Sequence, residues 1–240
     1  MAYYGWDEIV YVLIGGYDLK TVVTGLALED EAVVVEKHFA ADVYPTSIIL
    51  GTGRGAVEID AVLNSPTTDQ IVSTSGAGRV LSVLYAGNIV SGLCALYRSV
   101  KIGGISVPLS PDDIHGLKPT FVNSGKVYLI GRVVAPVAAR SAAGNTDATY
   151  CDLGAGITIG TVALHVTALT LGGYTNLIAK LRDSADHITF ADHTTMTAVT
   201  AIGAEAKDLA ACNRYTSISW AWTGAGSGQS WTGGVVAGAD

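Results

Sequence analysis

Apolar residues recur at every second position along most of this chain, and this spacing restricts the possible folds. Side chains alternate between the two faces of a β-strand, so a period of two indicates strands that bury one face. Gly, Asn and Asp punctuate these runs, as they do between the strands of all-β proteins. The clearest predicted strands are 21–28, 32–39, 57–63, 79–85, 126–135, 162–169 and 214–223. We therefore expect a mostly β fold.

The run 214–223 predicts which face of its strand is buried. Ile218, Trp220 and Trp222 lie on one face with Thr216, while small and polar residues occupy the other face. Burying one such side chain stabilises a fold by about 1.5–3 kcal/mol. We expect Ile218, Trp220 and Trp222 to form the core of a central C-terminal strand.

Helix signals are few. Ser65-Pro66 and Ser110-Pro111 each place an N-cap residue before a proline, with acidic residues following, which predicts one or two short helices. Residues 202–211 have a helix-forming composition but also alternate, and the surrounding β pattern favours a strand there.

The segment 140–150 is small and polar, with turn-forming Asn145 and Asp147. It predicts a linker between two β lobes, residues 1–148 and residues 149–240. Most basic residues precede this segment, and three of the four Trp follow it.

Charged residues make up only 15% of the chain, against about 25% in ordinary soluble domains. The surface must therefore consist largely of Ser, Thr, Gly and Ala, or be partly covered by other copies of the chain. This is the first indication of self-assembly.

Several functional classes are disfavoured by charge and composition. The formal net charge of −7 repels a phosphate backbone, so tight nucleic-acid binding is not expected. No basic leader and no run of 18 apolar residues is present, so we expect neither a signal peptide nor membrane insertion. Cys94, Cys151 and Cys212 are too few and too distant to form a disulfide framework, and we expect buried, reduced thiols.

Two motifs have competing interpretations. Gly51-Thr52-Gly53-Arg54-Gly55 could cradle a phosphate, but a predicted strand rather than a helix follows it, which favours a hairpin loop. Asp186-His187 and Asp192-His193 could bind a metal, but both pairs fit turns at hairpin ends, the second covering 192–195.

No catalytic constellation is predicted. His115 lies near Asp112 and Asp113, but a helix cap already accounts for those acidic residues. Cys94 lies in an apolar strand, where a thiol is inert. The basic residues fit solvated strand faces, and they are Arg98, Lys101, Lys118, Lys126, Arg132 and Arg140. We expect no enzyme activity, no cofactor and no metal.

The order of several segments resembles the tail tube proteins, or major tail proteins, of long-tailed bacteriophages. The segments in the C-terminal part are 152–155, 161–166, 177–192, 197–201 and 213–220, and those in the N-terminal part are 16–19, 131–134 and 139–141. The tryptophan-rich C-terminal strand pair and the N-terminal Tyr3, Tyr4 and Trp6 depart from the family's pattern.

The resemblance implies an antiparallel β-sandwich or half-barrel whose copies form rings, commonly hexameric, stacked into a tube through which the genome passes. Closed rings would also protect exposed sheet edges. Six copies at −7 each would carry −42 formal charges, and an acidic wall lets DNA slide without sticking. The implied partners are copies of the chain and other tail proteins, and the implied location is the virion, after assembly in the host cytoplasm.

The segment 40–56, between two predicted strands, is the candidate for reaching a neighbouring subunit or ring. Its candidate contact residues are Tyr44, Pro45, Thr52, Gly53, Arg54 and Gly55. The alternative function is a β-sandwich binding module, a capsid decoration or a carbohydrate- or receptor-recognising tail protein, in which an exposed Trp231 would stack on sugar rings. A hydrolase that uses His115 is a third, weaker alternative.

Overall fold

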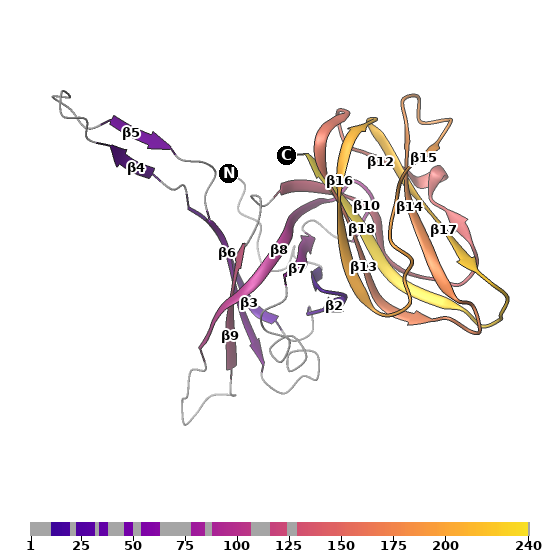
Figure 1. Ribbon diagram of the computed structural model, residues 1–240, viewed down its shortest axis with the longest axis horizontal. Helices are drawn as coiled ribbons and strands as arrows, with labels where there is room; N and C mark the ends of the chain where they lie inside the picture. Colours follow the sequence, from indigo (N-terminus) through magenta and orange to yellow (C-terminus); the bar gives the residue numbers. More distant parts are fainter. Residues whose placement is uncertain are drawn as a thin grey trace. The chain divides into compact units, whose positions relative to one another are not determined.

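The computed structural model is almost entirely antiparallel β (Figure 1), as the alternation predicted. It describes residues 11–19, 23–31, 34–37, 46–49, 54–62, 78–84, 88–106, 116–123 and 129–239. Each predicted strand overlaps an observed one, and 202–211 is also a strand. Within the described residues the only helix is a 3-10 turn at Asp147–Thr149; the helices expected at Ser65 and Ser110 lie outside them.

Contacts within the chain divide it into two compact units. Unit 1 comprises Met1–Thr21, Arg79–Arg98 and Leu129–Asp240, and unit 2 comprises Val22–Gly78 and Ser99–Tyr128. The chain therefore leaves unit 1 and returns to it, twice. This grouping differs from a division after residue 148, and that division stays a prediction.

Unit 1 contains two antiparallel sheets. The larger has the strand order β16-β13-β18-β10-β8-β7-β1-β2, and the smaller has the order β11-β17-β14-β15, with β12 also paired to β17. The strands of the larger sheet are β1 (Tyr11–Ile14), β2 (Tyr17–Asp18), β7 (Arg79–Leu84), β8 (Leu93–Ser106, which ends in unit 2), β10 (Leu129–Arg140), β13 (Ile157–Thr170), β16 (Gly203–Cys212) and β18 (Ser230–Ala239). Those of the smaller are β11 (Gly144–Asn145), β12 (Cys151–Asp152), β14 (Asn176–Ser184), β15 (Ala191–Thr195) and β17 (Tyr215–Thr223).

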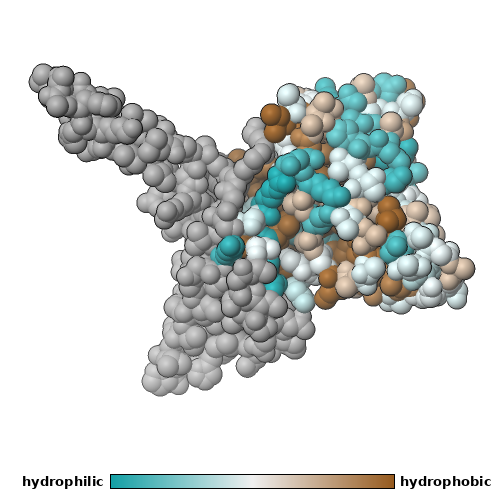
Figure 2. Space-filling view, in the orientation of Figure 1, coloured by the Kyte–Doolittle hydropathy of each residue, from teal (hydrophilic) through white to brown (hydrophobic). Residues whose placement is uncertain are grey.

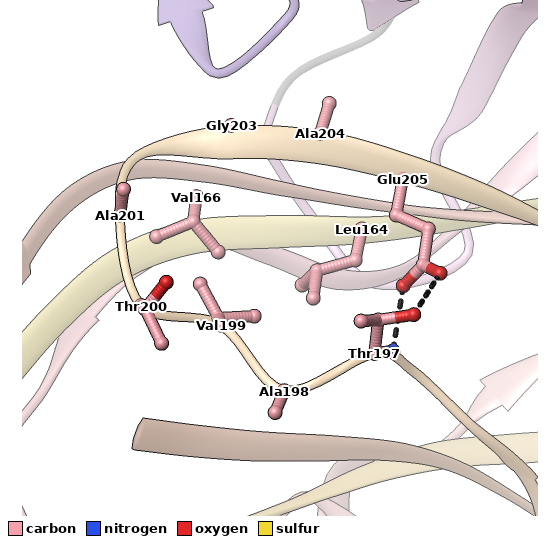
Figure 3. Close-up of a pocket in the computed structure, with 10 residues that line it drawn as sticks. All are labelled: Leu164, Val166, Thr197, Ala198, Val199, Thr200, Ala201, Gly203, Ala204 and Glu205. Carbon is pink, nitrogen blue, oxygen red and sulfur yellow. Dashed lines mark hydrogen bonds between the residues drawn. The ribbon is translucent and has the colours of Figure 1, made fainter. Parts of the chain in front are cut away.

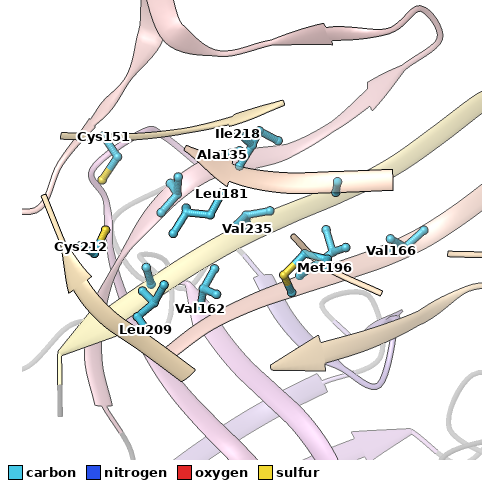
Figure 4. Packing of buried hydrophobic residues seen from close by; sticks show 14 of the residues in the cluster. Ala135, Cys151, Val162, Val166, Leu181, Met196, Leu209, Cys212, Ile218 and Val235 are labelled. Carbon is cyan, nitrogen blue, oxygen red and sulfur yellow. The ribbon is translucent and has the colours of Figure 1, made fainter. Parts of the chain in front are cut away.

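The layer β10-β18-β13-β16 has packing on both faces, most completely at its two central strands, β18 and β13. One face packs against the smaller sheet in a sandwich core that includes Leu181, Ile218 and Val235 (Figure 4). The other face packs against β1, β7 and β8 in a second core, to which Ala163 and Val236 belong. Because both faces of β13 and β18 are covered, these strands have continuous apolar runs rather than strict alternation.

The larger sheet curls so that strands distant in its order meet. Ser82 on β7 hydrogen-bonds to His165 on β13, and Arg98 on β8 forms an ion pair with Asp208 on β16. At the β1–β2 turn, a Cβ on Gly16 would lie 2.4 Å from the Gly203 backbone nitrogen, and φ is +88°. Only glycine fits there. This part of unit 1 is therefore a half-barrel.

A β-bulge in β10 is held by Asn88. The register between β10 and β18 shifts between Ala135 and Ala138. The side-chain amide of Asn88 donates to the Val137 carbonyl at 2.7 Å, and its oxygen accepts from the Val137 N–H at 2.7 Å. Asn88 thus provides the backbone pairing that Val137 lacks at the bulge.

Asn88→Ala is expected to lower the free energy of unfolding by about 1–3 kcal/mol, because it leaves a backbone donor and acceptor unpaired. Urea denaturation measures this change. Asn145→Ala is the matched control, since the Asn145 oxygen accepts only one exposed backbone hydrogen bond, from Asp147. Equal losses for the two variants would contradict the role assigned to Asn88.

Unit 2 contains three further strands of the larger sheet and a separate hairpin. In the sheet, β6 (Arg54–Val62) lies between β3 (Val23–Glu31) and β9 (Gly116–Asn123), and β9 also pairs with the end of β8. The hairpin consists of β4 (Val34–Lys37) and β5 (Thr46–Ile49), which form a two-stranded sheet of their own.

Candidate assembly surfaces

The β4–β5 hairpin covers part of the segment predicted to contact a neighbouring subunit. Its strands pair Val34 with Ile49 and Lys37 with Thr46, and neither strand pairs with any other described strand. An isolated two-stranded hairpin is marginally stable in water and usually needs a surface to pack against. The hairpin is therefore a candidate element for contact with another chain.

The six predicted contact residues fall in different places. Tyr44, Pro45, Thr52 and Gly53 lie outside the described residues, while Arg54 and Gly55 begin β6 and pair with Glu31 and Asp30. We expected the segment 40–56 to be a loop. Residues 46–49 within it form strand β5 instead, so it is not one continuous loop.

Side chains close one edge of the sandwich, between β15 and β16. The Lys207 ammonium donates to the Thr195 carbonyl at 2.8 Å, and the Glu205 carboxylate accepts from the Thr197 N–H at 2.7 Å. A ring nitrogen of His193 lies 3.1 Å from the Ala210 carbonyl oxygen. Because these contacts occupy backbone groups, this edge is a poor template for adding a strand from another copy.

Exposed isoleucines mark other parts of the surface. Ile130 on β10 and Ile159 on β13 are 70% and 58% exposed, and both lie beside the last residues of β18. Ile188, in the turn between β14 and β15, is 78% exposed. Figure 2 shows hydrophobic residues as separate spots among hydrophilic and weakly polar ones on the viewed face of unit 1.

A groove of about 380 Å³ lies at the end of the sandwich (Figure 3). Leu164, Val166 and Val199 line it, together with the Glu205 carboxylate. That carboxylate accepts hydrogen bonds from both the N–H and the hydroxyl of Thr197. The groove is apolar and its one charged group is already engaged.

The two Asp-His pairs lie in different environments. Asp186 is in the turn, where the N–H groups of Thr189 and Ile188 and the Ser184 hydroxyl lower the pKa of its carboxyl to about 2. His187 stacks on Tyr150, with ring centroids 5.5 Å apart, and does not join His193. Asp192 and His193 lie in strand β15, so the turn predicted at 192–195 is wrong. The exposed polar residues of this edge strand have a composition typical of turns, which explains the wrong prediction.

The candidate nucleophiles of the described residues are buried. Ser82 and His165 form a hydrogen-bonded pair, 2.8 Å from Oγ to Nε2, but both side chains are fully enclosed. Burial raises the pKa of Cys94 and of Cys212 to about 12, so neither thiol is suited to act as a nucleophile. Cys151 is also buried and unpaired, and His115 lies outside the described residues.

Two tryptophans on the last two strands, Trp220 on β17 and Trp231 on β18, stack on the Arg140 cation. Ile218 is fully buried, and Trp220 and Trp222 are partly buried and pack against the sandwich core. Trp231 is 1% exposed, so it is not available to stack on a sugar. The Arg140 guanidinium lies 4.7 Å from the Trp231 ring centroid. The expectation that Arg140 lies on a solvated strand face is therefore wrong.

Neither a protein-family model nor a curated protein matches the chain. Among solved structures, a component of a native gene transfer agent virion has 14% identity and a TM-score of 0.36, covering 53% of this chain and 98% of that one. A chain from the tail of an empty gene transfer agent particle has 13% identity and a TM-score of 0.36, and the match covers 53% of this chain and 98% of that one. The SPP1 Dit protein is described as a paradigm of the hub adsorption apparatus in phages that infect Gram-positive bacteria. It has 11% identity and a TM-score of 0.35, and the match covers 95% of this chain and 98% of that one. TM-scores this low do not establish a shared fold or function.

No helix among the described residues is long and apolar enough to cross a membrane.

Proposed function

We propose that this chain is a structural, non-enzymatic protein of a bacteriophage tail that assembles with copies of itself. The observation that carries the proposal is the β4–β5 hairpin, which pairs with no other described strand of its own chain. A neighbouring copy would provide the surface that the hairpin needs for stability. The order of segments shared with tail tube proteins provides the biological context.

In the proposed assembly, the copies form hexameric rings that stack into a tube for genome delivery. The hairpin and the adjoining residues Tyr44, Pro45, Thr52, Gly53, Arg54 and Gly55 contact a neighbouring subunit or ring. DNA passes through the lumen without tight binding, which fits a net charge of −7 per chain. Other tail proteins bind at the ends of the tube. The binding-module alternative depended on an exposed Trp231 and loses that support.

Replacing residues 34–49 with a short Gly-Ser link is expected to abolish assembly and to leave unit 1 folded, because unit 1 contains its own two cores. Negative-stain electron microscopy and mass measurement over a concentration series detect rings and tubes. Circular dichroism and thermal unfolding check that the variant is folded.

The matched control is Ile188→Ser, which changes an exposed apolar residue outside the hairpin. Rings or tubes formed by the hairpin variant at the wild-type protein concentration would contradict the proposal. The mass of the wild-type ring tests the hexamer directly. Single rings that never stack would favour a hub role over a tube role.

A further inference from the structure

Three metal-binding side chains meet at one end of the sandwich. Asp183 is near the end of β14, His193 is in β15 and Cys212 ends β16, and one possible ligand atom from each lies within 4.8 Å of the other two. Figure 4 shows Cys212 close to Leu209, at the margin of the sandwich core. The three strands come from both sheets of unit 1, so this cluster bridges the two layers.

Backbone contacts hold the cluster together. The Asn213 N–H, directly after Cys212, donates to the Asp183 carboxylate at 2.7 Å, which ties the end of β16 to β14. His193 lies within hydrogen-bonding distance of both the Ala210 carbonyl, at 3.1 Å, and the Thr194 hydroxyl, at 2.8 Å. The three side chains are therefore positioned by the fold and not gathered at random on a mobile loop.

Asp183 is a buried carboxylate that forms no ion pair with a lysine or arginine among the described residues. Its side chain accepts the hydrogen bond from Asn213, and the residue is only 7% exposed. A carboxylate offers about four acceptor positions, and a buried charge is normally paired with a cation or bound to a metal. Both the burial and the missing cation point to a positively charged ligand at this place.

We propose that Asp183, His193 and Cys212 bind a zinc ion. Carboxylate oxygen, imidazole nitrogen and thiolate sulfur are the three ligand types of zinc sites, and three protein ligands leave the fourth position for water. Zinc–ligand bonds of about 2.0–2.3 Å place neighbouring ligand atoms about 3.3–3.8 Å apart. The observed cluster reaches this spacing if the side chains close by about 1 Å, the scale of a small rotamer adjustment.

The surroundings of His193 and Cys212 are compatible with zinc binding. Whichever nitrogen of His193 binds zinc, the other keeps a partner that is already in place, Ala210 or Thr194. Cys212 is 3% exposed and His193 is half-buried, so an ion enters from the His193 side. The Cys212 thiol loses its proton to solvent when the sulfur binds zinc. The bound ion cross-links β14, β15 and β16.

The test uses the full chain, stripped of metal with a chelator and titrated with Co²⁺ and then Zn²⁺. We expect one ion per chain and a sulfur-to-cobalt charge-transfer band in the near ultraviolet. Cys212→Ser removes that band, and His193→Gln weakens zinc binding by at least about 100-fold, the upper end of what changes outside the ligand set cost. His187→Gln, an exposed histidine outside the cluster, is the matched control and retains both signals.

Thermal unfolding gives a second measurement. Zinc raises the unfolding midpoint of the wild-type chain and of His187→Gln, because it binds the folded state only, and leaves the midpoint of His193→Gln unchanged. Equal zinc affinity of the wild type and His193→Gln would overturn the proposal. If Cys212→Ser does not fold, Asp183→Asn and His193→Gln still decide the result. Zinc binding is measured without assembly, so it stands or falls independently of the tail function.

Discussion

Replacing Trp231 with alanine is expected to lower the free energy of unfolding by about 3–5 kcal/mol, the usual cost of truncating a buried aromatic side chain. Trp231 is the largest fully buried side chain of the described residues. It lies on β18, which pairs with β10 on one side and β13 on the other. A cavity there would open in the layer that both cores share, where neighbouring strands have little freedom to collapse.

Arg140 adds to this loss. Its guanidinium stacks on Trp231 at 4.7 Å and Trp220 at 5.3 Å. It also donates hydrogen bonds to the carbonyl oxygens of Gly233 at 2.8 Å and Pro136 at 2.9 Å. Burial lowers the pKa of Arg140 to about 10, so the aromatic faces and carbonyls stabilise a cation that is partly removed from water. Without the Trp231 ring, this cation would keep its position at a higher free energy.

Two tryptophan variants test the argument. Trp231→Phe is expected to cost much less than Trp231→Ala, because the Trp231 indole N–H has no hydrogen-bond partner among the described residues. Trp222→Ala is the matched control at the margin of the core, where the ring is only partly buried. Urea denaturation of the assembly-defective hairpin variant avoids stabilisation by neighbouring copies. A Trp231→Ala loss no larger than the Trp222→Ala loss would refute this account.

The strands could be predicted from local pattern, and the alternation in β17 also indicated that Ile218 is buried. Contacts between residues distant in the sequence could not be predicted in this way. Trp231 follows a Gly/Ser turn, but it is buried because β18 pairs with β10 and β13, where the partners of Trp231 are Arg140 and Leu169, 91 and 62 positions earlier. The same reason applies to Arg140, which lies in a polar segment typical of a linker yet packs against two tryptophans.

The division into units and the cluster of Asp183, His193 and Cys212 could not be predicted from the sequence either. Unit 1 is built from three separate stretches of chain, and no change of composition marks where the chain leaves it. The repeated Asp-His pairs drew attention to His193, but its neighbours in space are Asp183 and Cys212 rather than His187. A one-residue register irregularity between β14 and β15, at Leu181 and Arg182, contributes to that arrangement and leaves no sequence signal.

His165 predicts that unit 1 loses stability in mild acid. The imidazole is fully buried, its Nδ1 has no hydrogen-bond partner among the described residues, and burial lowers its pKa from 6.5 to about 3. Between these two values the unfolded chain binds a proton that the folded chain does not. Stability is therefore complete above pH 6.5 and falls as the pH drops, by about 1.4 kcal/mol per pH unit.

The window between pH 6.5 and 4.5 isolates this effect. Asp152 and Asp186 have pKa values lowered to about 2, and the stability they contribute is lost only at lower pH, as unfolded carboxylates begin to bind protons near pH 4. Across the window we expect a loss of about 2–3 kcal/mol in the free energy of unfolding, measured by urea denaturation at each pH.

The double variant Ser82→Ala/His165→Leu removes both partners of the buried pair, so neither is left unpaired, and its stability should change little over the same window. His187→Gln, which changes an exposed imidazole, should keep the wild-type slope. A wild-type slope that persists in the double variant would show that other groups carry the acid sensitivity. If the slope disappears in both variants, exposed groups at the surface, rather than His165 in the half-barrel core, cause the acid sensitivity.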